Sequence, residues 1–231
     1  MSPFVFLAVP PAPPAPPPGA RHGPSSPPPR LGDLLAPPRR SRGLLVRPAD
    51  VGGRAAWDVL VRDGALETVR DDAAVVAGTP VTPLLRAALL AGSLPAGAVA
   101  AGRTAAWVHV GRAAGPRATE HLDVAYAAGG HRPELWGAGL VWQAPLLRGD
   151  VVELAGARVT APLRTVVDVA VHVPVEDDAA RLARTVADAC GLALADAAAL
   201  LERRARVVGR PRARRVLARA GALRAAPAAL P

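Results

Sequence analysis

The segment from Asp150 to Ala170 shows the clearest change in the spacing of apolar and polar residues along the chain. Two short β-rich runs, 150–154 and 157–160, flank the dipeptide Ala155-Gly156, which is typical of a tight turn between strands. Pro162 follows where a helix can begin, because the first helical residue needs no N–H donor. The pattern therefore predicts a strand, a turn, a second strand and a helix.

The helix that follows Pro162 is predicted from its apolar spacing. Leu163, Val166, Val167 and Ala170 recur at i, i+3, i+4 and i+7, which places them on one buried face. Arg164 and Asp168 are four residues apart on another face, where they are expected to pair weakly. We interpret this unit as scaffold, because its polar residues resemble turn and helix-surface groups.

The same criteria predict further elements on both sides of this unit. Thr82 caps a helix that Pro83 opens, and the acidic residues 176–178 occupy the first turn of another, where they complement the helix dipole. Alternating apolar residues indicate strands at 121–126 and 140–143. The predicted helices span 82–91, 98–109, 175–190 (with Val175, Ala179, Leu182, Val186 and Ala189 inward), 194–202 and 209–220 (with Ala213, Val216, Leu217 and Ala220 inward).

Residues 44–78 have the pattern of a small, degenerate winged helix. A short helix at 48–51 and a turn at Gly52-Gly53 precede a helix over 54–63, whose inward residues are expected to be Ala56, Val59 and Leu60. Runs at 66–69 and 74–77 would form the two strands of the wing, with Arg70-Asp71-Asp72 at its tip.

These elements predict an α+β fold: a small winged-helix-like N-terminal module, a central mixed α/β part with a short antiparallel sheet, and C-terminal helices. The expected organisation is a disordered Pro/Arg-rich tail at 1–43, the winged-helix-like module at 44–78, an α/β domain with a basic C-terminal helix at 79–220, and a flexible tail at 221–231. The proline runs in the first segment favour polyproline II and cannot form a packed core.

Two motifs resemble segments of a known family. Val159-Thr-x-Pro-x-Arg-Thr-x-x-Asp168, preceded by Gly149-Asp150-Val-Val-Glu153, is similar to a segment common in actinobacterial AbiEi-type antitoxin-like proteins. The helix motif Arg103-Thr-Ala-Ala-Trp-Val-His-Val-Gly111 resembles one that lies upstream in the same proteins. The resemblance covers roughly 44–220. Some relatives append an endonuclease domain, which we do not expect in this chain.

The resemblance implies a function in a type IV toxin–antitoxin system. Such antitoxins typically combine repression of their own promoter with neutralisation of a nucleotidyltransferase-like toxin. The resemblance thus implies a winged-helix DNA-binding module, an AbiEi antitoxin C-terminal-like domain, and DNA and a toxin as partners. It names no reaction.

Composition changes this picture in two ways. All 28 basic residues are Arg, and the absence of Lys, Ile and Asn fits a GC-rich coding bias, which weakens Arg abundance as an indication of nucleic-acid binding. A single cysteine, Cys190, excludes an intramolecular disulfide and favours a reducing compartment. No run of about 20 clean apolar residues exists, so no membrane span is expected and a cytoplasmic location is predicted.

The net charge of +9 is unevenly distributed. Residues 44–199 carry 14 Arg against 17 acidic residues, whereas 200–231 carry nine Arg against one acidic residue. The C-terminal end is therefore the strongest candidate for contact with phosphate. The candidate nucleic-acid-binding residues are Arg47, Arg54, Arg62, Arg70, Arg203, Arg204, Arg206, Arg210, Arg212, Arg214, Arg215 and Arg219.

Each basic group also has a plainer interpretation. The C-terminal arginines could be a solvated helix face. The acidic wing tip, Asp71 and Asp72, should repel phosphate, and 44–78 as a whole carries four Arg against six acidic residues. A protein-interaction module of the same fold that has lost DNA readout is therefore the alternative to a DNA-binding regulator.

Residue patterns of enzymes are not recognisable in the chain. The histidines lack the spacing of a zinc hydrolase helix, no Gly-rich phosphate loop with Lys is present, and no G-x-S-x-G elbow occurs. We expect no catalytic residues, no metal, no cofactor and no small-molecule substrate. The sequence thus predicts a non-enzymatic, antitoxin-like transcriptional regulator.

Overall fold

The structure, a computed structural model, describes residues 44–70, 72–115, 118, 121–130, 132 and 139–223. The predicted tail at 1–43, the wing-tip residue Asp71 and most of the predicted C-terminal tail lie outside these residues. Within them, no helix is long and apolar enough to cross a membrane.

The elements of the N-terminal segment occur in the predicted order. A short 3-10 helix, η1 (Pro48–Val51), leads through Gly52 and Gly53 into α2 (Arg54–Arg62). Strands β1 (Leu66–Arg70) and β2 (Ala73–Val76) form an antiparallel hairpin, and Val46 adds an isolated bridge to Ala74.

The inward face of α2 differs from the prediction. Trp57 is buried and packs with Leu66 and Ala74, while Leu60 and Val61 lie partly buried beside them. Val59, predicted to face inward, is exposed. The largest apolar side chain of the helix therefore sets the buried stripe, because Trp57, Leu60 and Val61 also satisfy the i, i+3, i+4 spacing.

The larger part of the fold surrounds a five-stranded sheet with the order β5-β4-β3-β7-β6. Its strands are β3 (Val99–Ala100), β4 (Val124–Ala127), β5 (Val141–Ala144), β6 (Val151–Leu154) and β7 (Ala157–Thr160). The α+β class and the β6–β7 hairpin are confirmed. The sheet is mixed, since β3 pairs antiparallel with β4 but parallel with β7, and β4 pairs parallel with β5.

The central strand β3 was not predicted, and the helix expected over 98–109 begins later. Val99 and Ala100 are fully buried, and their strand pairs with β4 on one side and with β7 on the other, so α4 (Gly102–Val110) follows the strand. Two apolar residues give no periodicity that distinguishes a strand from a helix start. Gly102 permits the sharp entry, because it has φ +53° and a Cβ there would lie 2.9 Å from Asp123 Oδ2.

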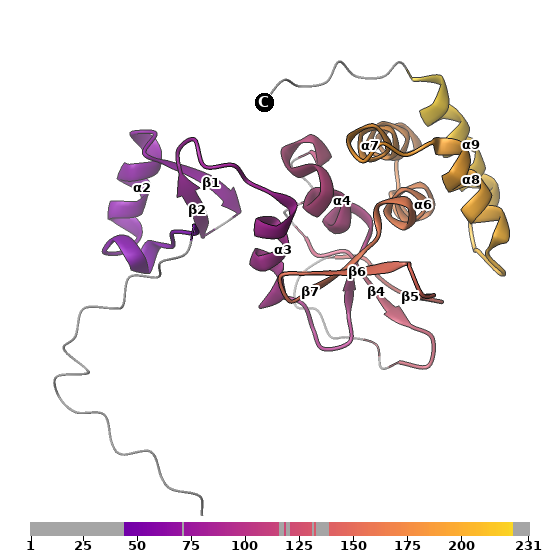
Figure 1. Ribbon diagram of the computed structural model, residues 1–231, viewed down its shortest axis with the longest axis horizontal. Coiled ribbons are helices and arrows are strands. Elements are labelled where there is room, and N and C mark those ends of the chain that lie inside the picture. The colour runs from indigo at the N-terminus through magenta and orange to yellow at the C-terminus, as the bar shows by residue number, and fades with distance from the viewer. Residues whose placement is uncertain are drawn as a thin grey trace, which may run out of the picture. The chain divides into compact units, whose positions relative to one another are not determined.

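The remaining helices follow the prediction closely. Thr82 accepts a hydrogen bond from the amide of Leu85 and caps α3. These helices are α3 (Pro83–Ala91), α6 (Pro162–His172), α7 (Glu176–Ala189), α8 (Leu194–Arg203) and α9 (Arg210–Ala222). The 3-10 turn η2 (Gly111–Ala114), which follows α4, has no counterpart in the prediction. Figure 1 shows α4, α6 and α7 on the same side of the sheet, with α8 and α9 packed beyond them.

The core lies between these helices and the sheet. Trp107 of α4, Val159 of β7 and Val169 of α6 are buried in it, as are all four predicted inward residues of α9. On α7 the buried residues include Ala179, Leu182 and Val186, as predicted, whereas Val175 and Ala189 at its two ends are exposed. Packing of α9 on α7 therefore makes the basic helix an integral part of the fold.

Candidate functional site

The arginines of α9 flank its buried stripe and are held by acidic residues of α7 and α8. Arg214 makes a two-bonded ion pair with Glu202, with both N–O distances 2.7 Å. On the α7 side, Arg215 lies 2.7 Å from Glu176 and Arg219 lies 2.8 Å from Asp177. These exposed pairs reduce the positive charge that α9 offers to an external phosphate.

Two further arginines of α9 bind main-chain carbonyls. Arg212 donates to the carbonyls of Ala170 and Pro174, at 2.9 and 2.8 Å, and also to those of Val171 and Val173. These carbonyls lie at the C-terminal end of α6, where the helix leaves acceptors unpaired and a cation is favoured. Arg210 donates to the carbonyl of Arg204. Both residues consequently hold the fold together.

Arg204 is a correction to the predicted nucleic-acid interface. Its guanidinium is buried and pairs with the carboxylate of Asp150, and it donates to the carbonyl of Pro145 at 3.1 Å. A phosphate cannot reach this side chain without breaking the buried ion pair. Arg204 therefore links the end of α8 to the loop before β6.

The expected weak surface pair of Arg164 and Asp168 is also corrected. Both side chains are buried, with Arg164 Nε 2.9 Å from Asp168 Oδ1, and Arg164 also lies 3.1 Å from Asp150 Oδ2. Asp150, Arg164, Asp168 and Arg204 thus form one buried ion network. The resembling motif supplies three of its members, Asp150, Arg164 and Asp168, and these three belong to the interior rather than to the helix surface.

Burial and charge shift the pKa values in this network in opposite directions. Burial alone would raise the pKa of Asp150, but hydrogen bonds from Arg204 and the Leu147 amide and the charge of Arg164 lower it below its usual range. Burial raises the pKa of Asp168 to about 6 against the pull of Arg164. Burial, followed by the charges of Arg164 and Arg212, lowers the pKa of the adjacent His172 to about 4.

The predicted arginines of the N-terminal module are mostly engaged. Arg47 pairs with Asp72 at 3.1 Å, and Arg54 pairs with Asp58 at 2.9 Å. Arg70 lies with its guanidinium 5.9 Å from the ring centre of Trp107, which is a cation–π distance. These contacts orient the module's arginines toward its own acids and toward the core.

Three of the twelve predicted arginines are exposed without an acidic partner in the part of the chain that the structure describes. They are Arg62 at the end of α2, Arg203 at the end of α8 and Arg206 in the following loop. Arg203 and Arg206 flank the buried Arg204, so the ion network fixes the segment that carries them. Among the twelve predicted residues, two of the three free arginines therefore lie just before α9.

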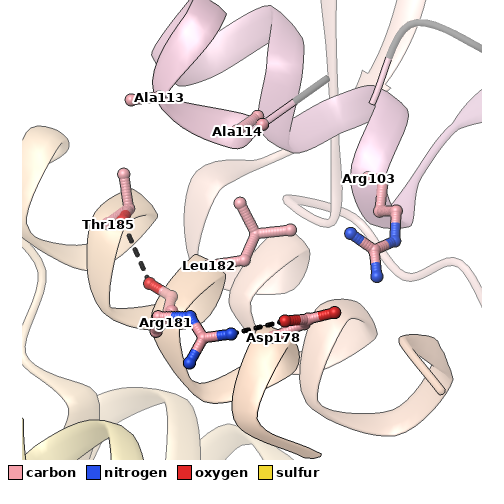
Figure 2. Close-up of a pocket in the computed structure, with 8 residues that line it drawn as sticks. Arg103, Ala113, Ala114, Asp178, Arg181, Leu182 and Thr185 are labelled. Carbon is pink, nitrogen blue, oxygen red and sulfur yellow. Dashed lines mark hydrogen bonds and ion pairs between the residues drawn. The ribbon is translucent and has the colours of Figure 1, made fainter. Parts of the chain in front are cut away.

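A cavity of about 440 Å³ lies between α7 and the α4–η2 region, lined by Arg103, Ala114, Asp178, Arg181 and Thr185 among others. Figure 2 shows Arg103 across from the α7 residues. Arg181 pairs with Asp178 at 2.6 Å, and its main-chain carbonyl accepts a bond from the Thr185 hydroxyl. The polar groups of this cavity are thus satisfied mainly by one another, and they form no nucleophile–base arrangement.

The described residues contain no group of three or more His, Cys, Asp or Glu side chains that could hold a metal ion. His109 lies with Nε2 2.8 Å from the carbonyl of Thr160, and burial lowers its pKa. Cys190 ends α7 half-buried, with a thiol pKa that burial raises. The surroundings of His109 and Cys190 are therefore those of residues that support the fold.

Comparison with known proteins gives no family. No protein-family model matches the sequence, and no curated protein matches it. Among solved structures, the Rv2827c protein from Mycobacterium tuberculosis aligns over 73% of this chain and 79% of its own, with 20% identity and a TM-score of 0.31. The resemblance to AbiEi-type proteins therefore stays a prediction.

Proposed function

We propose that this chain is a non-enzymatic, antitoxin-like transcriptional regulator that acts in the cytoplasm. It would bind DNA mainly through the segment between α8 and α9, and its partner would be a nucleotidyltransferase-like toxin. The observation that supports DNA contact is the pair Arg203 and Arg206, which are exposed without an acidic partner in the described chain beside an arginine-rich helix. Exposed arginines of this kind bind the phosphate backbone without reading sequence.

The excess charge of α9 adds to this attraction. Five arginines of α9 share three acidic residues, so the helix keeps a positive balance after its internal pairing; the acids are Glu176, Asp177 and Glu202. The pairs of Arg214, Arg215 and Arg219 are exposed and weak, so a phosphate can compete for their donors. The N-terminal module would then supply positioning through Arg62.

A protein-interaction module without DNA readout is the second candidate. The ion pairs of Arg47 with Asp72 and of Arg54 with Asp58 support it, because they neutralise half of the module's predicted phosphate contacts. The exposed Val59 and Val76 of the same module add apolar surface that a protein partner could cover.

The salt dependence of DNA binding separates the two candidates. Two or three phosphate contacts predict that log K falls with log salt with a slope of about −2 to −3, whereas the five contacts of a fully free basic cluster would give about −4 to −5. Fluorescence anisotropy with a labelled duplex measures this slope between 50 and 200 mM salt. Replacing Arg203 and Arg206 by Gln should bring the slope about two units closer to zero.

The matched control replaces Arg148 and Arg158, two exposed arginines of the β6–β7 region, by Gln. It removes the same formal charge and should leave most of the slope in place. If the control brings the slope as close to zero as the double replacement of Arg203 and Arg206 does, binding follows net charge and the proposed interface is wrong. A wild-type slope near zero would favour the interaction module.

A further inference from the structure

A second cavity, of about 210 Å³, is lined by residues of the β1–β2 hairpin and the segment after it, of α3, and of the junction between α4 and η2. An apolar protein cavity of about 150 Å³ can hold benzene, so this one has room for a single ring with a small substituent. Three apolar and three charged residues are among those that line it: Val69, Val81, Trp107, Glu67, Arg86 and Arg112.

Arg86 is a buried positive charge in the wall of this cavity. The residue is only 8% exposed, and burial lowers the pKa of its guanidinium. It donates to the carbonyls of Val108 at 2.9 Å and His109 at 3.2 Å, and also to that of Val81. Within the described residues it forms no ion pair. Arginine keeps its charge in proteins, so the described chain leaves a buried cation without an anion.

The three carbonyls satisfy Arg86 only in part. Two of them, those of Val108 and His109, belong to the C-terminal end of α4, where a helix carries a partial negative charge. A guanidinium has five N–H donors, of which Arg86 uses three in these bonds. Buried charges are usually paired with an opposite charge, because taking them out of water is costly. An anion in the cavity would therefore stabilise Arg86 further.

Arg112 supplies a second positive charge to the same cavity. It follows Gly111, where a Cβ would lie 2.8 Å from Arg86 Nη1, so the Arg86 guanidinium lies against the backbone next to Arg112. Arg112 pairs with Glu67 at 3.0 Å and donates to the carbonyl of Thr68 at 3.1 Å. Both side chains of the ion pair are exposed, and such pairs are weak, so a ligand carboxylate can replace that of Glu67. The lining thus carries two arginines against one acid, which favours an anion.

The apolar part of the lining favours a ligand with a ring. Trp107 is buried in the core and Val69 packs against the same core, and both also line the cavity. Arg70 lies over the ring of Trp107, with its guanidinium carbon 5.9 Å from the ring centre. Aromatic side chains bury a large apolar area and pack well against other rings. The cavity therefore combines an aromatic and aliphatic wall with a positively charged one.

We infer that this cavity binds a small aromatic monocarboxylate, with its carboxylate against Arg86 and Arg112 and its ring against Val69 and Trp107. Guanidinium groups bind carboxylates through charge-assisted hydrogen bonds, which are stronger than those between neutral groups. The ligand supplies the anion that the described chain does not give to Arg86. The inference goes beyond DNA binding and does not depend on it, because these four residues are not among the proposed phosphate contacts.

Benzoate is the probe that tests it, with benzamide as an uncharged molecule of nearly the same shape. In the full chain labelled with ¹⁵N, at constant salt, benzoate should shift the backbone amides of Thr79, Gly111 and Arg112. The shifts should saturate with a Kd at or below about 1 mM, which is ordinary for so small a ligand. Benzamide, which lacks the charge, and acetate, which lacks the ring, should each bind at least about tenfold more weakly.

Variants of the exposed ion pair identify the charged contact. Arg112→Gln should weaken benzoate binding by about tenfold. Glu67→Gln should strengthen it by about threefold, because it removes the carboxylate that competes for Arg112. The matched controls are Arg54→Gln, which breaks the exposed pair with Asp58, and Glu153→Gln, at an exposed position of β6. Both controls should leave the Kd within about 1.5-fold of wild type, since they lie outside the cavity.

Two variants inside the cavity complete the test. Arg86→Gln should abolish binding, and Thr79→Phe, which places a ring in the cavity from the segment before α3, should do so even if Arg86→Gln fails to fold. The inference is wrong if benzoate gives no saturable shift up to about 10 mM, or if benzamide or acetate binds as tightly. Weaker binding in Glu67→Gln, or unchanged binding in Thr79→Phe, would also overturn it.

Discussion

Replacing Asp150 by Asn is expected to lower the free energy of unfolding by about 3–5 kcal/mol, the cost of removing one partner from a buried ion pair. Asp150 accepts from both Arg164 and Arg204, and from the amide of Leu147 at 2.8 Å. Without its charge, two buried guanidinium groups face only Asp168. Urea unfolding of wild type and variant, monitored by tryptophan fluorescence, measures the difference.

The control for this prediction is Asp188→Asn. Asp188 pairs with Arg184 at 2.8 Å near the surface of α7, and such pairs contribute about 0–1 kcal/mol. If Asp150→Asn costs no more than the control, the ion network is not important for stability. The position of Arg203 and Arg206, which the network fixes through Arg204, would then need another explanation.

The second large effect is on the pH dependence of stability, where Asp168 and His172 act in opposite senses. The folded protein holds Asp168 at a pKa of about 6, above its ordinary 3.8, so its contribution to stability is lost as pH rises from about 4 to 6. It holds His172 at about 4, below its ordinary 6.5, so its contribution is lost as pH falls from 6.5 to 4. In the wild type the pH-dependent contributions of Asp168 and His172 to the free energy of unfolding largely cancel.

Single replacements should separate the two contributions. Asp168→Asn leaves the effect of His172, so stability should rise by roughly 1–3 kcal/mol between pH 4 and 6.5 relative to wild type. The ring of His172 stacks on that of Trp142, with the ring centres 4.1 Å apart. His172→Phe keeps a ring there and leaves the effect of Asp168, so relative stability should fall over the same range. Urea midpoints at four pH values test this, and parallel profiles for all three proteins would contradict it.

The elements with strong periodicity could be predicted from the sequence. The helices α6, α7, α8 and α9 each present a regular apolar stripe, and the β6–β7 hairpin carries its own turn, so local sequence determines them. Strand β3 could not be predicted, because Val99 and Ala100 are too few to show a period and become a strand only by pairing with β4 and β7. Tertiary pairing decided that segment.

The candidate site was harder to predict because it depends on long-range partners. Arg204 and Asp150 are 54 residues apart, and nothing near either residue indicates that they meet. Arg164 and Asp168 have the spacing of a surface pair, and they are buried because α6 packs against α8 and Arg164 bonds the loop before β6. The acids that hold the α9 arginines lie on α7 and α8, so the sequence overestimates the free charge of the basic helix.

The most direct test of the proposed function is binding of the full chain to the DNA upstream of its own gene, compared with a scrambled duplex, at physiological salt. Point variants are needed, because α9 contributes buried Val216 and Leu217 and its removal would disrupt the fold. A regulator predicts at least about tenfold preference for its own DNA, which replacing Arg203 and Arg206 by Gln weakens on both duplexes alike. Equal binding to both duplexes that disappears at this salt concentration would contradict a regulator and favour the interaction module.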